Sequence, residues 1–392
     1  MSPQGAIWNE GPLLSLPARM LVCAVVMLHA AVSVGAEPCK ERSCSRAPHT
    51  VLVRPGESIQ AAIDSVANGG SIVIEPGTYR LQSSLIVSGK QVAIIGSGAR
   101  GDQRTELVGP EPTELVPAAL ARGLIEYEAG GGSRVQAVAL RGFDAGIVSR
   151  DSEARSALAI RDTVIQRTGR GILWNSASPL TVNDSEIQHT LGNGVSLMAV
   201  PKGALYAFHD LGLSNIDQVG FLVVGQGAGC VLLHNIFKVE NIFEGGHTGG
   251  GILILDGCAD IKDGLLAGNS SYGIALVRSS ATIHGTVILD TAPRPSDGQF
   301  GDGVAAFLSS VELTGLDIER SARVGISNFG SMLKFTGNLL NCNHINLAGE
   351  DVGPIDFEYL DGGGNVCGCG DALVACQVLS LDLEPPDPVS VP

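Results

Sequence analysis

Short runs of alternating apolar and polar residues follow one another along most of the chain, and Gly, Asn or Asp separates them. The run Leu158–Arg161, which Asp162 closes, is typical. A period of two residues predicts short, half-buried strands. Gly, Asn and Asp between the runs indicate corners with backbone dihedral angles that other residues disfavour. The pattern therefore predicts an all-β protein built from many short strands.

Two series of residues repeat in step, at intervals of 22 to 31 residues. The first is Gly146-Ile147, Gly171-Ile172, Gly194-Val195, Gly220-Phe221, Gly251-Ile252, Gly273-Ile274, Gly303-Val304 and Gly325-Ile326. The second is Asp162, Asp184, Asp210, Asn235, Asp263, Gly285, Gly315 and Gly337. Such short strands cannot bury a face alone, but stacked coils share a core and pair in parallel. The repeat indicates a parallel β-helix rather than a leucine-rich repeat, whose Leu and Asn pattern differs.

A helical segment precedes the coils. Residues 58–66 space their apolar side chains as one helix face does, with Ser58 as N-cap and Gly69-Gly70 as the stop. This short helix is expected to cover the open end of the coil stack, where strand edges would otherwise be exposed. Residues 97–134 are less regular and are expected to hold a loop over the coils.

The segment VRPGESIQAAIDSVANGGSIVIEPGTYR, together with the repeats, resembles the right-handed parallel β-helix proteins with the pectin-lyase-like fold. The resemblance covers roughly residues 50–345. It implies a right-handed, single-stranded parallel β-helix with a short N-terminal capping helix. Proteins with this fold include lyases, hydrolases, esterases, epimerases and adhesins, so the fold alone does not give the activity.

The catalytic motifs of enzymes with this fold are incomplete in the chain. Residues 246–249, Gly-His-Thr-Gly, only partly match the Gly-His-Gly motif of polygalacturonase-like members. Residues 293–295, Pro-Arg-Pro, lack the pattern around the Arg of pectate-lyase-like members. Residues 136–141 match a pectin-methylesterase-like string without the segment that should follow it. These departures favour binding or structural work slightly over catalysis.

The residue before each position of the second series should point outward on one strand face. In chain order these residues are Arg161, Asn183, His209, His234, Lys262, His284, Thr314 and Thr336. Coils stack about 4.8 Å apart, so His209, His234, Lys262 and His284 should form one contiguous stripe. As catalytic candidates they could exchange protons as general acids or bases, and Arg161 is a candidate for substrate binding. The alternative is a solvated face that happens to contain three His.

Two insertions lengthen the same corner, between residues 235 and 251 and between residues 285 and 303. They should stand as paired loops along one side of a groove, where binding groups concentrate. His247 and Arg294 are candidates for substrate binding. Glu244, Asp297 and Asp302 are candidate oxygen ligands for calcium. The alternative is that both are tolerated insertions without a function.

Nine cysteines are present, and Cys23 lies in an apolar N-terminal run. The other eight are candidates for structural disulfides, which is typical of an exported chain. They are Cys39, Cys44, Cys230, Cys258, Cys342, Cys367, Cys369 and Cys376. The sequence does not give the connectivity. Cys230 and Cys258 share a column in adjacent coils, so they should be either bonded or a reduced stacked pair; the Cys-x-Cys at 367–369 could also bind metal.

The apolar run 20–34 follows Arg19, and Val34-Gly35-Ala36 offers small residues for cleavage. This predicts a signal peptide over 1–36, with Met1 or Met20 as the start, and an export to the cell envelope or the medium. We expect a Cys-containing segment at 37–50, the β-helix at 51–340, a Cys-rich cap at 341–378 and a flexible tail at 379–392. The mature chain is expected to lack a membrane span and to be a monomer.

The composition fits a coil stack, because 52 of 392 residues are Gly and aromatic residues make up only 4%. The net charge of −15 argues against nucleic acid as a partner, because the field of the chain repels phosphate. The first functional hypothesis is an exported protein that binds an acidic or neutral polysaccharide along a lateral groove. In the enzymatic version of this hypothesis, the protein would also cleave the chain, as a lyase or a hydrolase. The second is a non-catalytic structural or adhesive surface protein.

Overall fold

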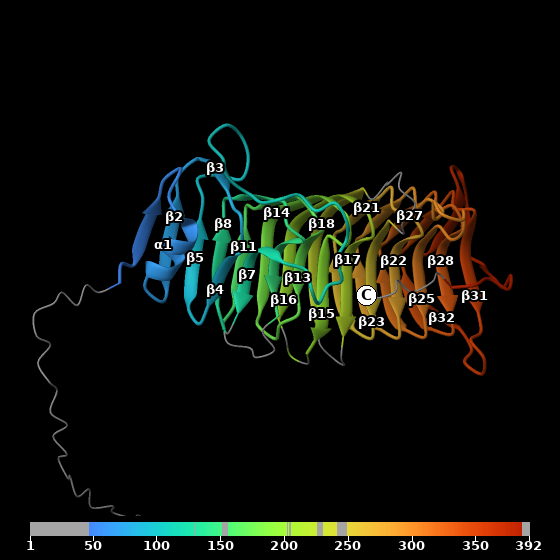
Figure 1. Cartoon of the computed structure of the whole chain (residues 1–392). Coiled ribbons are helices and arrows are strands. Elements are labelled where there is room, and N and C mark those ends of the chain that lie inside the picture. Colours follow the sequence, from blue (N-terminus) through green and yellow to red (C-terminus); the bar gives the residue numbers. More distant parts are fainter. Residues whose placement is uncertain are drawn as a thin grey trace, which may run out of the picture. The chain divides into compact units, whose positions relative to one another are not determined.

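The structure is a computed structural model that describes residues 47–128, 130–150, 156–201, 203, 205–225, 230–240 and 249–385. The predicted signal peptide 1–36, Cys39, Cys44, Glu244 and His247 lie outside the described residues. Residues 46–392 form one compact unit. Within it the chain winds as a parallel β-helix, so the fold class predicted from the sequence is confirmed (Figure 1).

The strands form three sheets: two extend along most of the stack of coils (Figure 1), and the third belongs to the C-terminal coils from Leu265 onward. Sheet A contains β1 (Thr50–Val53), β2 (Gly70–Ile74), β3 (Gly77–Arg80), β5 (Gln91–Ile95), β6 (Thr105–Val108), β8 (Gly132–Gln136), β9 (Ala139–Arg141), β11 (Leu158–Arg161), β12 (Val164–Thr168), β14 (Leu180–Thr190), β16 (Tyr206–Ile216), β18 (Cys230–Glu240), β20 (Cys258–Lys262), β23 (Ser280–His284), β26 (Ser310–Thr314), β29 (Met332–Thr336) and β32 (Glu358–Asp361).

Sheet B contains β4 (Leu85–Ser88), β7 (Gly123–Glu128), β10 (Ala145–Ser149), β13 (Arg170–Trp174), β15 (Val195–Val200), β17 (Val219–Gly225), β19 (Gly250–Leu255), β22 (Tyr272–Val277), β25 (Asp302–Phe307), β28 (Val324–Phe329), β31 (Ile345–Glu350) and β35 (Val378–Leu379). Sheet C contains β21 (Leu265–Ala267), β24 (Val287–Leu289), β27 (Asp317–Glu319), β30 (Leu339–Asn341), β33 (Val366–Cys369) and β34 (Ala372–Ala375). Ile, Leu and Val from successive coils stack inside all three sheets and form one continuous core.

The second repeated series marks a corner in eight of the coils. All eight of its residues have a positive φ, from 42° at Asp162 to 65° at Gly337. Asp and Asn tolerate this left-handed conformation better than other side chains, and Gly adopts it freely. The prediction that these residues supply unusual dihedral angles is confirmed, and it fixes which side chains of each strand face outward.

Glycine is needed in the first series for a different reason from the one that the sequence suggested. They lie in or beside the strands of sheet B and do not have positive φ. A Cβ atom on Gly171 would lie 2.3 Å from the carbonyl oxygen of Gly194, and one on Gly251 would lie 2.2 Å from that of Gly273. The expectation that these glycines form corners is therefore wrong. Glycine is required at Gly171 and Gly251 because the next coil approaches too closely for a side chain.

Polar side chains also join successive coils at the corners. Ser279 Oγ accepts from the Gly257 N–H, Ser309 Oγ from the Ser279 N–H, and Ser331 Oγ from the Ser309 N–H, at 2.8–3.1 Å. The last of these amides, Ser331 N–H, donates to Asn328 Oδ1 instead. These hydrogen bonds satisfy amides that the strand ladders leave unpaired.

The N-terminal helix α1 spans Ile59–Ser65, and Ser58 caps it by accepting a hydrogen bond from the Ala61 N–H at 3.2 Å. The helix ends at Val66, before the predicted stop at Gly69. Its buried face joins the first coils of the core (Figure 1). The loop expected within residues 97–134 is shorter than this range, because β6, β7 and the start of β8 lie in it. The buried Arg170 side chain donates to the Val116 carbonyl at 2.8 Å and holds the segment between β6 and β7 on sheet B.

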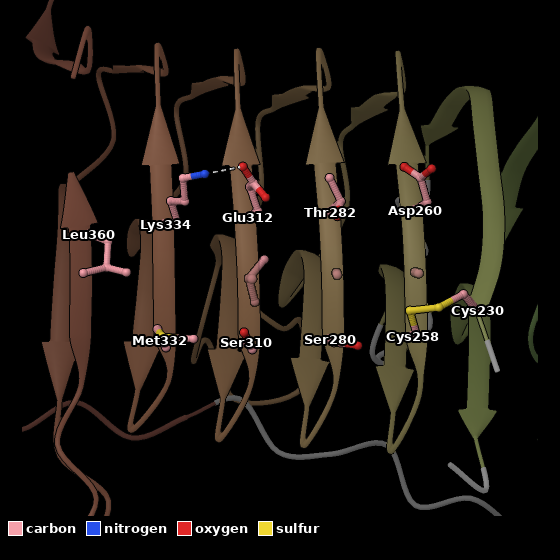
Figure 2. Close-up of a pocket in the computed structure, with 13 residues that line it drawn as sticks. Cys230, Cys258, Asp260, Ser280, Thr282, Ser310, Glu312, Met332, Lys334 and Leu360 are labelled. Atoms are coloured by element: carbon pink, nitrogen blue, oxygen red, sulfur yellow. Dashed lines mark hydrogen bonds and ion pairs between the residues drawn. A yellow bond between two sulfur atoms is a disulfide. The ribbon is translucent and has the colours of Figure 1, made fainter. Parts of the chain in front are cut away.

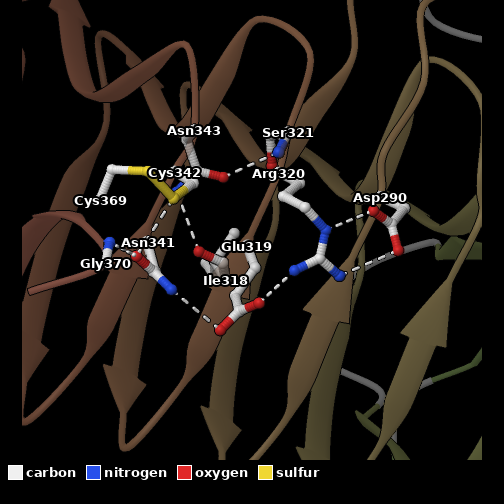
Figure 3. Close-up of polar contacts among 10 residues, drawn as sticks. All are labelled: Asp290, Ile318, Glu319, Arg320, Ser321, Asn341, Cys342, Asn343, Cys369 and Gly370. Carbon is white, nitrogen blue, oxygen red and sulfur yellow. Dashed lines mark hydrogen bonds and ion pairs between the residues drawn. A yellow bond between two sulfur atoms is a disulfide. The ribbon is translucent and has the colours of Figure 1, made fainter.

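The C-terminal coils continue past residue 340, where the sequence placed the end of the β-helix. β31, β32 and β33 pair in parallel with β28, β29 and β30, and only β34 turns back antiparallel. Two disulfides, Cys342–Cys369 and Cys367–Cys376, hold this end together. Figure 3 shows the first of them beside a line of polar contacts in which Arg320 joins Asp290 to Glu319.

The predicted flexible tail is attached over its first residues. The Glu350 carboxylate accepts from the Leu381 N–H at 2.6 Å and from Ser380 Oγ at 2.9 Å. These hydrogen bonds lower the pKa of Glu350, although partial burial opposes the shift. Arg323 also donates to the Glu384 carbonyl at 2.7 Å. Residues 386–392 lie outside the described part of the chain.

Candidate functional site

A groove of about 470 Å³ runs across the outer face of sheet A, over β18, β20, β23, β26, β29 and β32. Figure 2 shows that side chains of neighbouring strands stand in two rows, and β20, β23, β26 and β29 each contribute one residue to both rows. The lower row is Cys258, Ser280, Ser310 and Met332, and the upper row is Asp260, Thr282, Glu312, Lys334 and Leu360. Rows form because parallel strands in register place equivalent side chains one coil apart, about 4.8 Å.

The stripe predicted from the sequence borders this groove. The strand register places His209 beside His234, His234 beside Lys262, and Lys262 beside His284. The imidazole rings of His209 and His234 meet edge to face with centroids 5.2 Å apart. Arg161 lies two coils before His209 in the same column and is exposed. The placement of the stripe therefore agrees with the predicted register.

Asp260 connects the stripe to the groove, and the sequence reasoning missed it. Its Oδ2 atom lies 2.8 Å from Lys262 Nζ and 3.8 Å from His234 Nε2. Its Oδ1 atom and His234 Nε2 are buried and make no hydrogen bond within the described residues. The signal was present, because the alternation in β20 that sends Lys262 outward also sends Asp260 outward.

A second ion pair crosses the groove further along. Lys334 Nζ lies 2.8 Å from Glu312 Oε1, between adjacent strands (Figure 2). A neighbouring hollow of about 490 Å³ shares Ser310 and Met332 with the groove. It extends the surface toward Arg278 and Glu358, so the two hollows together cross the face of sheet A.

The groove also contains the disulfide between Cys230 and Cys258, which joins adjacent coils (Figure 2). Of the two alternatives for this pair, the bonded one is confirmed. The six bonded cysteines also decide against a metal at the Cys-x-Cys motif, because Cys367 and Cys369 each bond to another cysteine.

Arg294 lies on the insertion between β24 and β25 and contacts two residues of that insertion, Asp297 and Phe300. Its Nε atom donates to the Asp297 carboxylate at 3.0 Å, and its guanidinium lies 4.6 Å from the centroid of the Phe300 ring. The hydrogen bond from Arg294 lowers the pKa of Asp297. The other predicted wall of the groove, at residues 241–248, lies outside the described residues, so the pairing of the two loops stays a prediction.

Asp302 faces inward, which corrects its predicted place among metal ligands. It is fully buried, binds Arg323 Nε at 2.7 Å and accepts from Ser327 Oγ at 2.9 Å. Burial raises the pKa of Asp302, and the hydrogen bonds from Arg323 oppose that shift. Asp302 and Asp297 therefore bind different arginines and do not converge. Over the described ranges, no group of three or more His, Cys, Asp or Glu side chains is placed to hold a metal ion.

Comparisons with known proteins bear on the fold. No protein-family model and no curated protein matches the chain. Among solved structures, the A-module of the mannuronan C-5 epimerase AlgE4 from Azotobacter vinelandii is similar with a TM-score of 0.56 and 15% identity, over 82% of this chain and 94% of that one. The AlgE6 A-module from the same organism is similar with a TM-score of 0.50 and 17% identity, over 79% and 94%.

The catalytic domain of a GH87 α-1,3-glucanase in complex with tetrasaccharides is similar with a TM-score of 0.50. Its identity is 12%, over 83% of this chain and 70% of that one. At such identities the likeness shows a shared fold, which agrees with the resemblance drawn from the sequence.

Proposed function

We propose that the protein binds a polysaccharide along the groove on sheet A. The observation that carries this is the groove itself, in which strands in register present rows of polar side chains at one spacing. A ligand that repeats along its length can make the same contact in each coil. The similar structures add support, since one is a mannuronan epimerase module and another is a glucanase in complex with tetrasaccharides.

The chemistry of the groove also suits sugar. Ser280, Thr282 and Ser310 offer hydroxyl groups that can both donate and accept hydrogen bonds. Met332 and Leu360 are 46% and 42% exposed and offer apolar surface at one end of the groove. Sites for small organic groups typically combine apolar surface with a few placed polar groups.

The setting we propose is outside the cell or in its envelope, after cleavage behind Ala36. Three disulfides are typical of proteins that fold in an oxidising compartment. No helix among the described residues is long and apolar enough to cross a membrane. The monomeric state, the exclusion of nucleic acid by the charge of −15, and calcium near Asp297 stay parts of the proposal.

A second candidate function is cleavage of the bound chain, as a lyase or a hydrolase. The contact of Asp260 with His234 and Lys262 favours it, because a carboxylate, an imidazole and an amine together can remove and return a proton. His209 and His284 would flank this group in the same stripe.

The test is a polysaccharide panel, with binding read by affinity electrophoresis and calorimetry and turnover read by reducing ends and by absorbance of unsaturated products. His234→Ala, His284→Ala and Asp260→Asn should each weaken binding about tenfold, the worth of one hydrogen bond to a charged group. His344→Ala is the matched control, because His344 is exposed and lies outside the groove.

Wild-type protein that binds no glycan of the panel would refute the proposal and favour the structural or adhesive rod. A loss with His344→Ala equal to that with His234→Ala would place the binding surface elsewhere. Unchanged turnover in His234→Ala and Asp260→Asn would dismiss the stripe as catalytic.

A further inference from the structure

We propose that the groove selects a neutral polysaccharide and rejects a polyuronate. This rests on the proposed function and names the substrate class of the same site. A stripe that contains His and Lys residues could in principle bind a carboxylated sugar. The ion pairs in the structure point the other way.

Each described Lys or Arg along the two hollows already has a carboxylate partner. Lys262 binds Asp260 and Lys334 binds Glu312, each at 2.8 Å. Arg278 binds Asp256 through two hydrogen bonds of 2.7 Å. The hydrogen bonding to Arg278 lowers the pKa of Asp256. The groove therefore holds paired charges rather than a row of cations waiting for an anion.

The carboxylates on the surface of the far hollow are not matched by additional cations. Asp356 and Glu358 line this hollow, and its one described cation, Arg278, is paired with Asp256. The chain as a whole carries −15. This field opposes the approach of a polyanion and leaves a neutral chain unaffected.

A uronate bound to Lys262 or Lys334 would have to compete with the protein carboxylate already there. The displaced Asp260 is only 28% exposed and would lose its cation in a partly buried position, which is costly. Hydroxyl groups need no such exchange. They can accept from the remaining N–H groups of Lys262, whose side chain is 41% exposed, and exchange hydrogen bonds with the hydroxyl groups of Ser280 and Thr282.

The apolar end of the groove fits the same ligand. Met332 and Leu360 lie in adjacent strands, with Lys334 beside Leu360 in the upper row (Figure 2). They offer surface to the C–H groups of a sugar ring, whereas a polyuronate would place carboxylates near Glu312 and Glu358. Both features favour a chain whose polar groups are all hydroxyls.

The experiment compares soluble glucans and mannans with alginate and polygalacturonate, at low salt and about pH 8, where free imidazole is neutral. Wild-type protein is expected to bind at least one neutral polymer at least about tenfold more tightly than either polyuronate. Glu312→Gln should release Lys334 and raise affinity for the polyuronates by about three- to fivefold, as for one exposed ion pair. Adding Lys334→Met to that variant should cancel the gain.

The matched control is Asp290→Asn, which changes the net charge by the same amount. Asp290 pairs with Arg320 at 2.6 Å away from the groove, among the contacts of Figure 3. A gain in polyuronate affinity in this control equal to that in Glu312→Gln would show an effect of net charge and overturn the proposal.

The remaining outcomes separate the two proposals. Preferential binding of a polyuronate by the wild-type protein would overturn the neutral-ligand inference and leave polysaccharide binding standing. Absence of binding to every polymer would overturn both.

Discussion

Two disulfides join neighbouring coils and close loops of nearly equal length, so their removal should cost nearly equal stability. Cys230–Cys258 spans 28 residues in the middle of the described coils, and Cys342–Cys369 spans 27 residues at the C-terminal end. If a disulfide acts by restricting the unfolded chain, the loss depends on loop length alone. The loss is then about 3.6 kcal/mol for either bond.

The double variants Cys230→Ala/Cys258→Ala and Cys342→Ala/Cys369→Ala test this by guanidinium unfolding followed with circular dichroism. The shorter bond Cys367–Cys376 spans 9 residues and should cost about 2.6 kcal/mol, which gives an internal scale. Thiol titration verifies that the remaining disulfides are intact.

An effect that competes with loop length is local unfolding at the end of the stack. In a stack of coils each unit contacts only its neighbours, so the last coil could open by itself. A separate early transition in the terminal variant, or losses that differ by more than about 1 kcal/mol, would refute the loop-length reasoning. Stability would then depend on where a bond lies in the stack.

Two further predictions concern the core and the alkaline limit. Phe208→Ala should cost about 3–5 kcal/mol, because Phe208 is fully buried and packs edge to face on Phe221, while Leu205→Ala, at a site 69% exposed, should change stability by less than about 0.5 kcal/mol; equal losses in urea unfolding would contradict this. Burial raises the pKa of Tyr206 to about 12, above its usual value of 10.0, so the unfolded state loses its proton first and stability should fall as pH rises from about 10 to about 12. Tyr206→Phe should flatten that decline, and an unchanged pH dependence would show that Tyr206 does not cause it.

The rows of side chains in the groove could be predicted because they follow from the repeat of the coils and from the alternation of side chains along each strand. Once Asp162 and its equivalents fix the corner of each coil, alternation assigns the outward residues, and the stripe from His209 to His284 follows. The same rule sends Asp260 and Glu312 outward. Their importance depends on the ion pairs with Lys262, in the same strand, and with Lys334, in the next coil. The repeat period alone does not predict these side-chain contacts.

The side-chain contacts of the insertions could not be predicted from the repeat period. Asp302 and Asp297 lie close in sequence, yet Asp302 begins a buried strand and binds Arg323, whereas Asp297 stays in the loop with Arg294. The sequence spacing of Asp297 and Asp302 does not show that an arginine from the next coil binds the Asp302 carboxylate. The first-series glycines were located correctly and explained wrongly, because a close approach between coils leaves the same sequence signal as a tight corner.

The serine corners give the stack a direction. Ser279, Ser309 and Ser331 each accept a hydrogen bond from an amide in the coil before them, so each of these three coils is completed by the one that follows. Asn328 ends the series, because its side-chain oxygen accepts from the Ser331 N–H. A chain cut at an earlier one of these boundaries would leave an amide without its acceptor from the protein. A shortened solenoid thus needs its own terminating residue, and transplanting an Asn at the position equivalent to Asn328 supplies one.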